Sequence, residues 1–78
     1  MLIVGVEERK GEYEGRAYRF FNCYAEYEDR HVTGKRTEKI KVPGDVFDDF
    51  TGTPESVVGL DLQFNYDKYG KVVSIFEI

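Results

Sequence analysis

Residues 16–29, RAYRFFNCYAEYED, form the longest run of strand-forming residues in the chain. Alternate side chains of a strand point to opposite faces of a sheet. From Phe21 onward, one set of alternate residues is apolar and suited to a core: Phe21, Cys23, Ala25 and Tyr27. The other set mixes aromatic with polar residues: Arg16, Tyr18, Phe20, Asn22, Tyr24, Glu26 and Glu28. We therefore expect a long strand with one core-forming face and one solvated aromatic face, around which the rest of the chain folds.

The segments on either side of this strand have the patterns of shorter strands. Residues 2–6 are rich in strand formers and are expected to end as a strand at the charged residues 7–10. Residues 11–15 contain two glycines and are typical of a loop or a wide turn. Residues 29–35 form a second polar connection. Residues 37–42 then alternate between polar and apolar side chains, which predicts a strand with Ile40 and Val42 inward and Lys39 and Lys41 outward.

Helical spacing replaces this alternation in residues 45–58. Asp45 is a candidate N-cap, because a carboxylate can accept hydrogen bonds from the free N–H groups of the first helical turn. Pro54 is a second start signal, since proline is favoured at the first position of a helix. We expect one or two helical turns here, with Phe47 and Phe50 covering one end of the sheet.

Two further strands are expected at the C-terminal end. Residues 60–66 alternate with the even-numbered positions apolar, which predicts a half-buried strand. Residues 67–70 are typical of a hairpin turn, with Gly70 at a positive φ. Residues 71–78 are mostly apolar, so we expect the final strand to be central or paired on both sides.

The resulting order is strand, long strand, strand, short helix, strand, strand. It predicts a mainly β fold, a small five-stranded OB-like barrel with a short helix between strands 3 and 4. An SH3-like barrel or another small β-roll is the alternative. We expect residues 1–78 to form a single domain, because a chain of 78 residues leaves no room for a second unit.

Composition restricts the compartment and the partners. No apolar run is long enough to span a membrane, and the first residues lack the features of a signal peptide. A single cysteine allows no internal disulfide, so we expect a cytoplasmic protein that does not bind membranes. The net charge of −4 argues against nucleic acid, but the charge is uneven. Residues 9–41 hold nine Lys or Arg against six Asp or Glu, whereas residues 42–78 hold two against seven.

The sequence also lacks the motifs of common enzyme classes. His31 and Cys23 are the only residues of their kinds, and neither has a second ligand at metal spacing. Ser56 and Ser74 have no nucleophile motif around them. We therefore expect no catalysis, no metal and no cofactor. For Cys23 we favour a small core residue over a redox thiol, and for His31 a plain surface residue.

The aromatic residues are the candidates for function. Proteins bind single-stranded nucleic acid by stacking bases on Tyr and Phe while Arg and Lys contact the phosphates. Tyr69, expected at a hairpin tip beside Lys68, is a second such group. The residues expected to bind nucleic acid are Arg16, Tyr18, Arg19, Phe20, Tyr24, Lys35, Arg36, Lys39, Tyr69 and Lys71, with Lys41 as a further cation at the rim. The alternative for each ring is packing in the core or in a dimer interface.

Three short motifs resemble the small single-stranded DNA-binding proteins of filamentous phages, and the OB-fold proteins of phages and mobile elements more broadly. Gly15-Arg16-Ala17-Tyr18 is similar to that family's segment of glycine, basic residue, small residue and tyrosine, and Cys23-Tyr24 recurs further along the same strand. Tyr69-Gly70, followed by Lys71, is similar to the family's hairpin tip. The resemblance implies that Tyr18 and Tyr69 contact DNA. It also implies a homodimer that binds strands cooperatively.

The leading hypothesis is a non-catalytic OB-like protein that coats single-stranded DNA during replication or transfer of a phage or plasmid, with RNA as the alternative ligand. A second hypothesis is a protein-interaction or structural module that uses the same aromatic residues as its contact surface. A third is a phage factor whose acidic surface mimics DNA. The acidic residues that would form this surface are Asp45, Asp48, Asp49, Glu55 and Asp61.

Overall fold

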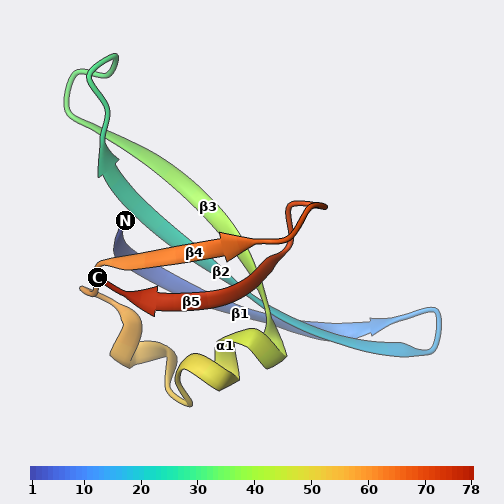
Figure 1. The fold of residues 1–78 in the computed structure, drawn as a ribbon. Coiled ribbons are helices and arrows are strands. Elements are labelled where there is room, and N and C mark those ends of the chain that lie inside the picture. Colours follow the sequence, from blue (N-terminus) through green and yellow to red (C-terminus); the bar gives the residue numbers. More distant parts are fainter.

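The computed structural model describes residues 1–78 and is mainly β (Figure 1). Strands β1 (Leu2–Tyr13), β2 (Arg16–Glu28) and β3 (Lys35–Pro43) form an antiparallel sheet in that order. Strands β4 (Leu62–Tyr66) and β5 (Val72–Glu77) form an antiparallel pair, and α1 (Gly44–Phe50) with the 3-10 helix η1 (Pro54–Val57) connects β3 to β4. The predicted order of five strands, with helical turns between the third and fourth, is confirmed.

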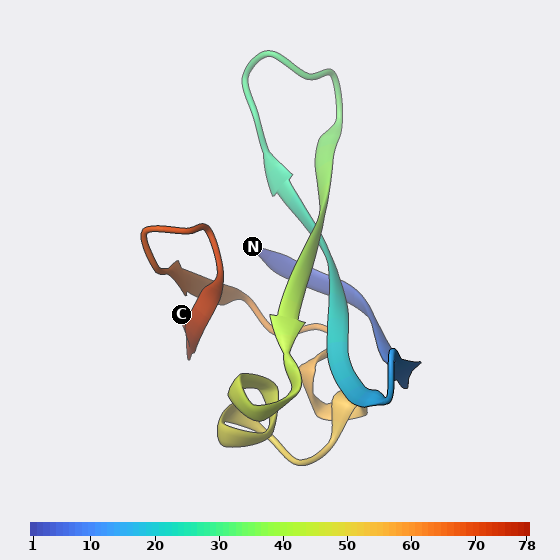
Figure 2. The ribbon, with the colours of Figure 1, turned by 90° about the vertical axis from the view of Figure 1, so that its right-hand side faces the viewer.

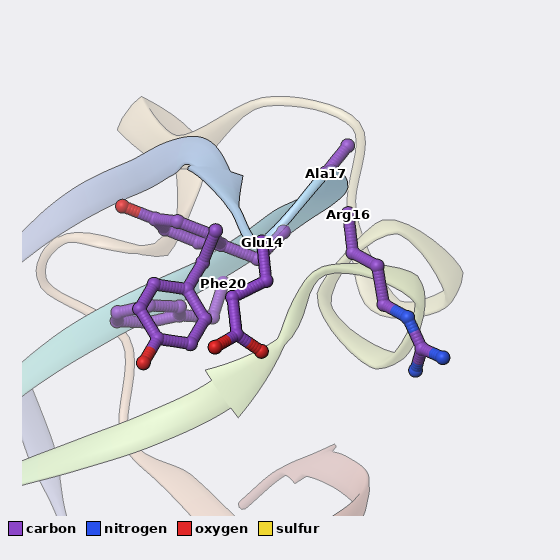
Figure 3. Close-up of a pocket in the computed structure, with 6 residues that line it drawn as sticks. Glu14, Arg16, Ala17 and Phe20 are labelled. Carbon is purple, nitrogen blue, oxygen red and sulfur yellow. The ribbon is translucent and has the colours of Figure 1, made fainter.

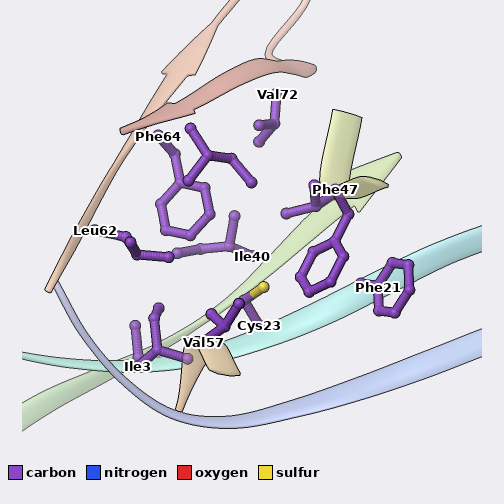
Figure 4. Close-up of a cluster of buried hydrophobic side chains, with 12 residues drawn as sticks. Ile3, Phe21, Cys23, Ile40, Phe47, Val57, Leu62, Phe64 and Val72 are labelled. Atoms are coloured by element: carbon purple, nitrogen blue, oxygen red, sulfur yellow. The ribbon is translucent and has the colours of Figure 1, made fainter. Parts of the chain in front are cut away.

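The core lies between the inner face of the three-stranded sheet, the β4–β5 hairpin and α1 (Figures 1 and 2). Its twelve buried side chains come from every element (Figure 4): Ile3, Phe21, Cys23, Ala25, Ile40, Val42, Phe47, Val57, Leu62, Phe64, Val72 and Ile75. The rings of Phe21 and Phe47 stack with their centroids 3.9 Å apart, which fixes α1 against β2. The inward positions predicted for β2, β3 and β4 are confirmed except at the strand ends, where Tyr27 is only half-buried and Tyr66 is 48% exposed. Phe47 covers the sheet as expected, and Phe50 packs against the core while partly buried.

Hydrogen bonding does not close the two sheets into a barrel. One isolated bridge, between Leu2 and Asp61, joins the start of β1 to the residue before β4. Next to it, the backbone N–H of Ile3 donates to the carbonyl oxygen of Leu60 at 2.9 Å. No ladder joins β3 to β5, although the two strands are in contact. The strands thus form an open shell around the core.

The first strand is longer than its sequence pattern predicts, so the expected end at residues 7–10 is wrong. β1 has 12 residues and continues to Tyr13. The expected wide turn is also wrong, because the turn consists of Glu14 and Gly15 alone, with φ angles of 51° and 77°. Two positive φ angles are the geometry of a tight hairpin whose twist matches that of the flanking strands. The charged residues continue the strand because backbone hydrogen bonds to β2, rather than burial, hold this part of the hairpin.

Two smaller expectations are wrong as well. The helix begins at Gly44, so its N-cap is Pro43 and not Asp45. The Asp45 carboxylate lies instead in the first turn, where it suits the helix dipole. β5 pairs with β4 only. Its Val72 and Ile75 side chains are buried in the core, whereas Val73 and Phe76 are 50% and 56% exposed. The turn before β5 has the predicted form, with Gly70 at a φ of 80°.

Cys23 is a fully buried core residue, as predicted. Burial raises the pKa of its thiol to about 11, so the thiol stays protonated at neutral pH. Neither helical segment has the length and apolar composition needed to cross a membrane.

Candidate functional site

The outer face of the three-stranded sheet carries the aromatic residues that the sequence singles out. Residues paired across antiparallel strands share a face, so the register adds side chains from β1 and β3 to those of β2. We call the following eight residues the outer face: Tyr13, Tyr18, Phe20, Tyr24, Arg9, Arg16, Lys39 and Lys41. Tyr13 is 71% exposed, Tyr18 44% and Tyr24 39%, while Phe20 is half-buried. The rings are therefore accessible to a ligand.

Tyr18 and Phe20 form the centre of this surface. Their ring centroids are 6.1 Å apart and their planes differ by 25°. Beside them, at the end of the β1–β2 hairpin, is an open hollow of about 810 Å³. The residues that line it are Tyr13, Glu14, Arg16, Ala17, Tyr18 and Phe20 (Figure 3). Figure 3 shows Arg16 extending away from the other lining residues, so its guanidinium is free to meet a ligand.

Cations lie directly beside the rings. The ammonium nitrogen of Lys41 is 4.4 Å from the centroid of Phe20 and takes part in no salt bridge. Lys39 is paired with Tyr24 in the register, and Arg9 is paired with Phe20 from the other side. Arg9 also forms a long salt bridge of 3.6 Å with Glu7. A second hollow is lined by these groups: Glu7, Arg9, Phe20, Asn22, Tyr24, Lys39 and Lys41. Positively charged side chains and aromatic rings thus lie next to one another on this part of the outer face.

Glu7 is an acid between these cations, and its role is to orient Tyr24. Its carboxylate accepts hydrogen bonds from the Asn22 amide at 3.1 Å and from the Tyr24 hydroxyl at 3.2 Å. The pKa of Glu7 is lowered by these two hydrogen bonds, with the larger effect from Asn22 and the smaller from Tyr24. The pKa of Tyr24 is raised mainly by burial and, to a smaller extent, by its hydrogen bond to Glu7. Glu7 therefore remains ionised at neutral pH and Tyr24 remains a hydroxyl donor.

Arg19, expected beside the rings, points to the opposite face of β2. Its guanidinium donates to Glu8 at 2.8 Å and to both carboxylate oxygens of Asp48 at 2.6 and 3.1 Å. The hydrogen bonds to Asp48 and then to Glu8 raise the pKa of Arg19, while that from Arg19 lowers the pKa of Asp48. Arg19 therefore links the β1–β2 hairpin to α1 and lies away from the outer face.

Lys35 and Arg36 lie at the far end of the β2–β3 hairpin, where both are paired with acids. The Lys35 ammonium donates to Glu28 at 2.7 Å, and this hydrogen bond raises the pKa of Lys35. The Arg36 guanidinium donates to Asp29 at 2.8 Å. The pKa of Asp29 is lowered mainly by the hydrogen bond from the backbone N–H of His31 and, to a smaller extent, by the hydrogen bond from Arg36. These two cations are locally neutralised and do not join the group around Phe20.

Tyr69 and Lys71 occupy a separate place in the molecule. Tyr69 is 82% exposed on the β4–β5 turn, and the ammonium of Lys68 is 5.1 Å from its ring centroid. The carboxylate of Asp67 shapes the turn by accepting backbone hydrogen bonds from Tyr69 at 2.8 Å and Lys71 at 3.0 Å. Both ribbon views show this turn well apart from the β1–β2 turn (Figures 1 and 2). The exposed ring expected at a hairpin tip is therefore present, but it lies away from the outer face.

The sequence analysis missed two residues of the outer face, Arg9 and Tyr13. Arg9 belongs to the charged residues at which the first strand was expected to end, and Tyr13 belongs to the expected turn. The signal that could have found them is Glu14-Gly15, because a two-residue turn fixes the register of the whole hairpin. Counting back from it pairs Tyr13 with Arg16 and Arg9 with Phe20. No group of three or more His, Cys, Asp or Glu side chains in the chain could hold a metal ion.

The chain matches no protein-family model, no curated protein and no solved structure. Its function is therefore inferred from the chemistry of the surface. The outer face offers four aromatic rings and four cations on one sheet, without a cluster of nucleophilic or metal-binding groups.

Proposed function

We propose that the protein binds single-stranded nucleic acid, with DNA as the first candidate, and that it is not an enzyme. Bases stack on the rings of the outer face, while its Lys and Arg side chains contact the phosphates. The observation that carries this proposal is the placement of Lys41 4.4 Å from the ring of a half-exposed Phe20, between Tyr18 and Tyr24. Each stacked base contributes about 1–3 kcal/mol, and stacking tolerates any sequence because every base has a flat face.

The spacing of the rings favours a single strand over a duplex. In a duplex, the faces of the bases are covered by their neighbours, whereas a single strand can be splayed so that each base meets its own ring. The two rings lie 6.1 Å apart, Tyr18 is 44% exposed and Phe20 is half-buried, so both have surface that a base can reach. We therefore propose that two neighbouring bases occupy these rings and that a further base reaches Tyr24.

The strand arrangement supports an OB-like barrel that is partly open. β1 adjoins β2 and, through the bridge between Leu2 and Asp61, the start of β4, while β3 contacts β5. Oligonucleotides bind to OB-folds on strands 2 and 3 and on the loops that follow strands 1 and 4. Phe20 and Lys41 lie on those strands, and the hollow at Arg16 and the ring of Tyr69 lie on those loops.

The resemblance to phage proteins extends the proposal to a cellular role. We propose a homodimer that coats single-stranded DNA during replication or transfer of a phage or plasmid. Size-exclusion chromatography with light scattering measures the mass directly, and a monomer at all concentrations removes this part of the proposal without affecting binding itself.

The test of the binding proposal is fluorescence anisotropy with a labelled oligo-dT at low salt, with oligo-U in a parallel titration. Tyr18→Ala removes one stack of about 1–3 kcal/mol, so we expect affinity to fall about 5- to 150-fold. Tyr66→Ala is the matched control, because Tyr66 is 48% exposed on β4 but lies off the outer face. No binding by the wild type, or equal losses in both variants, rejects the proposal.

A protein-interaction module is the second candidate, favoured by the exposure of Tyr13, the ring nearest the hairpin tip. Protein partners also cover exposed aromatic surface. Chromatography of Tyr24→Ala separates the two candidates. If this variant loses an oligomer that the wild type forms, and neither form binds oligo-dT or oligo-U, the second candidate is correct.

A further inference from the structure

The ring of Tyr18 lies across Gly11, its partner on β1. A Cβ atom on Gly11 would lie 2.6 Å from the hydroxyl oxygen of Tyr18, 2.9 Å from its Cζ and 3.1 Å from its Cε1. All three distances are shorter than a non-bonded carbon contact allows. The ring therefore occupies the space in which any other residue at this position would have its side chain.

Backbone conformation does not explain the glycine. The glycines with positive φ are Gly15, Gly34, Gly59 and Gly70, so Gly11 has a backbone that other residues adopt. A glycine inside a strand weakens it and often marks a close approach of another group. Here the group that approaches is the ring of Tyr18, and an aromatic ring laid over a glycine in a neighbouring strand is a known stabilising arrangement in sheets.

We propose that Gly11 is a positioning residue for the nucleic-acid surface, because its missing side chain lets Tyr18 lie across β1 while Tyr18 stays 44% exposed to a ligand. This inference rests on the proposed function. A ring already held against the strand loses less conformational freedom when a base stacks on it than a ring that moves freely in solvent. Gly11 thus acts on the ligand only through Tyr18.

Gly5 provides the matched comparison on the same strand and the same face. It is paired with Tyr24, but a Cβ on Gly5 would lie 3.7 Å from Cδ2 and 3.9 Å from Cβ of that tyrosine, which is ordinary contact. Tyr24 is also held by its hydrogen bond to Glu7. Alanine at position 5 therefore leaves the ring in place, whereas alanine at position 11 displaces it.

The experiment compares Gly11→Ala and Gly5→Ala for binding of oligo-dT, each alone and combined with Tyr18→Ala. We expect Gly11→Ala to weaken binding about 5-fold or more, the lower limit for losing one stack, and Gly5→Ala to leave binding unchanged. In the Tyr18→Ala background, Gly11→Ala should cause no further loss. Wild-type affinity in Gly11→Ala, or an equal loss with and without Tyr18, overturns the inference. Thermal unfolding of each variant verifies that it is folded.

A second measurement needs no ligand. A ring lying across Gly11 shifts the Hα resonances of Gly11 in the NMR spectrum, and Tyr18→Ala should abolish this shift. If the shift is absent from the wild type, the inference fails even when oligo-dT binds. If the shift is present but the wild type binds neither oligo-dT nor oligo-U, the proposed function fails and the positioning role fails with it, although the ring geometry stands.

Discussion

Replacing Lys41 with glutamine tests whether local charge on the outer face, rather than total charge, controls binding. The Lys41 ammonium is 4.4 Å from the ring centroid of Phe20 and is in no salt bridge. It is therefore available to a phosphate as soon as a base stacks beside it. Lys35 is the matched control, because it is on the same strand but its ammonium is 2.7 Å from the carboxylate of Glu28.

The size of the effect follows from counterion release. For single strands, the logarithm of the affinity falls against the logarithm of salt concentration with a slope of about −0.7 per phosphate contact. If all four cations of the outer face contact phosphates, with Arg9 exchanging its 3.6 Å salt bridge to Glu7 for a phosphate, the slope is about −2.8, or a loss of about 50-fold in affinity between 50 and 200 mM salt. Lys41→Gln should reduce the slope to about −2.1 and weaken binding about 5-fold at 0.1 M salt. Lys35→Gln should leave the slope near −2.8.

The assay is anisotropy of labelled oligo-dT at several salt concentrations, with urea unfolding to show that both variants are as stable as the wild type. The reasoning is refuted if Lys41→Gln retains the wild-type slope. It is equally refuted if Lys35→Gln changes the slope as much as Lys41→Gln, because binding would then respond to total charge and not to the arrangement on the outer face.

Two further predictions concern the acids. Glu7→Gln keeps an acceptor for Tyr24 but removes a negative charge beside the cations, so oligo-dT should bind a few-fold more tightly in the same titration, and weaker binding would show that the charge itself is needed. Asp48 has a pKa lowered below its ordinary 3.8 by Arg19, so its contribution to stability is present above that value and is lost as pH falls through the lowered pKa. Asp48→Asn should therefore be less stable than the wild type in urea at neutral pH, with a difference that closes in acid, and a difference independent of pH would contradict this account.

The buried parts of the fold could be predicted because burial leaves a periodic pattern. Phe21, Cys23 and Ala25 alternate along β2, and all three are buried where the alternation places them. The length of β1 could not be found in this way. Beyond Glu8 the β1–β2 hairpin extends past the core, where its two strands are held by backbone hydrogen bonds that leave no pattern of apolar residues.

In the candidate site, too, some residues can be predicted from alternation along one strand and others cannot. Alternation along one strand is enough to place Tyr18, Phe20 and Tyr24 on a single face, and the same rule separates Arg19 from them in spite of its position in the sequence. The partners supplied by β1 need the register between two strands. That register depends on the tight turn at Glu14 and Gly15, which a polar sequence with two glycines does not distinguish from a wider loop.

The acidic total charge of the chain is compatible with the proposed ligand because of where the acids lie. Asp45, Asp48 and Asp49 are on α1, which packs against the inner side of the three-stranded sheet, away from the outer face. Screening at 0.1 M salt weakens interactions between exposed charges that lie more than about 10 Å apart. A strand on the outer face therefore responds mainly to the local charges, which are the four cations and the ionised Glu7 between them. Asp48 is in addition bound to Arg19, which weakens the alternative that these acids imitate the phosphates of DNA.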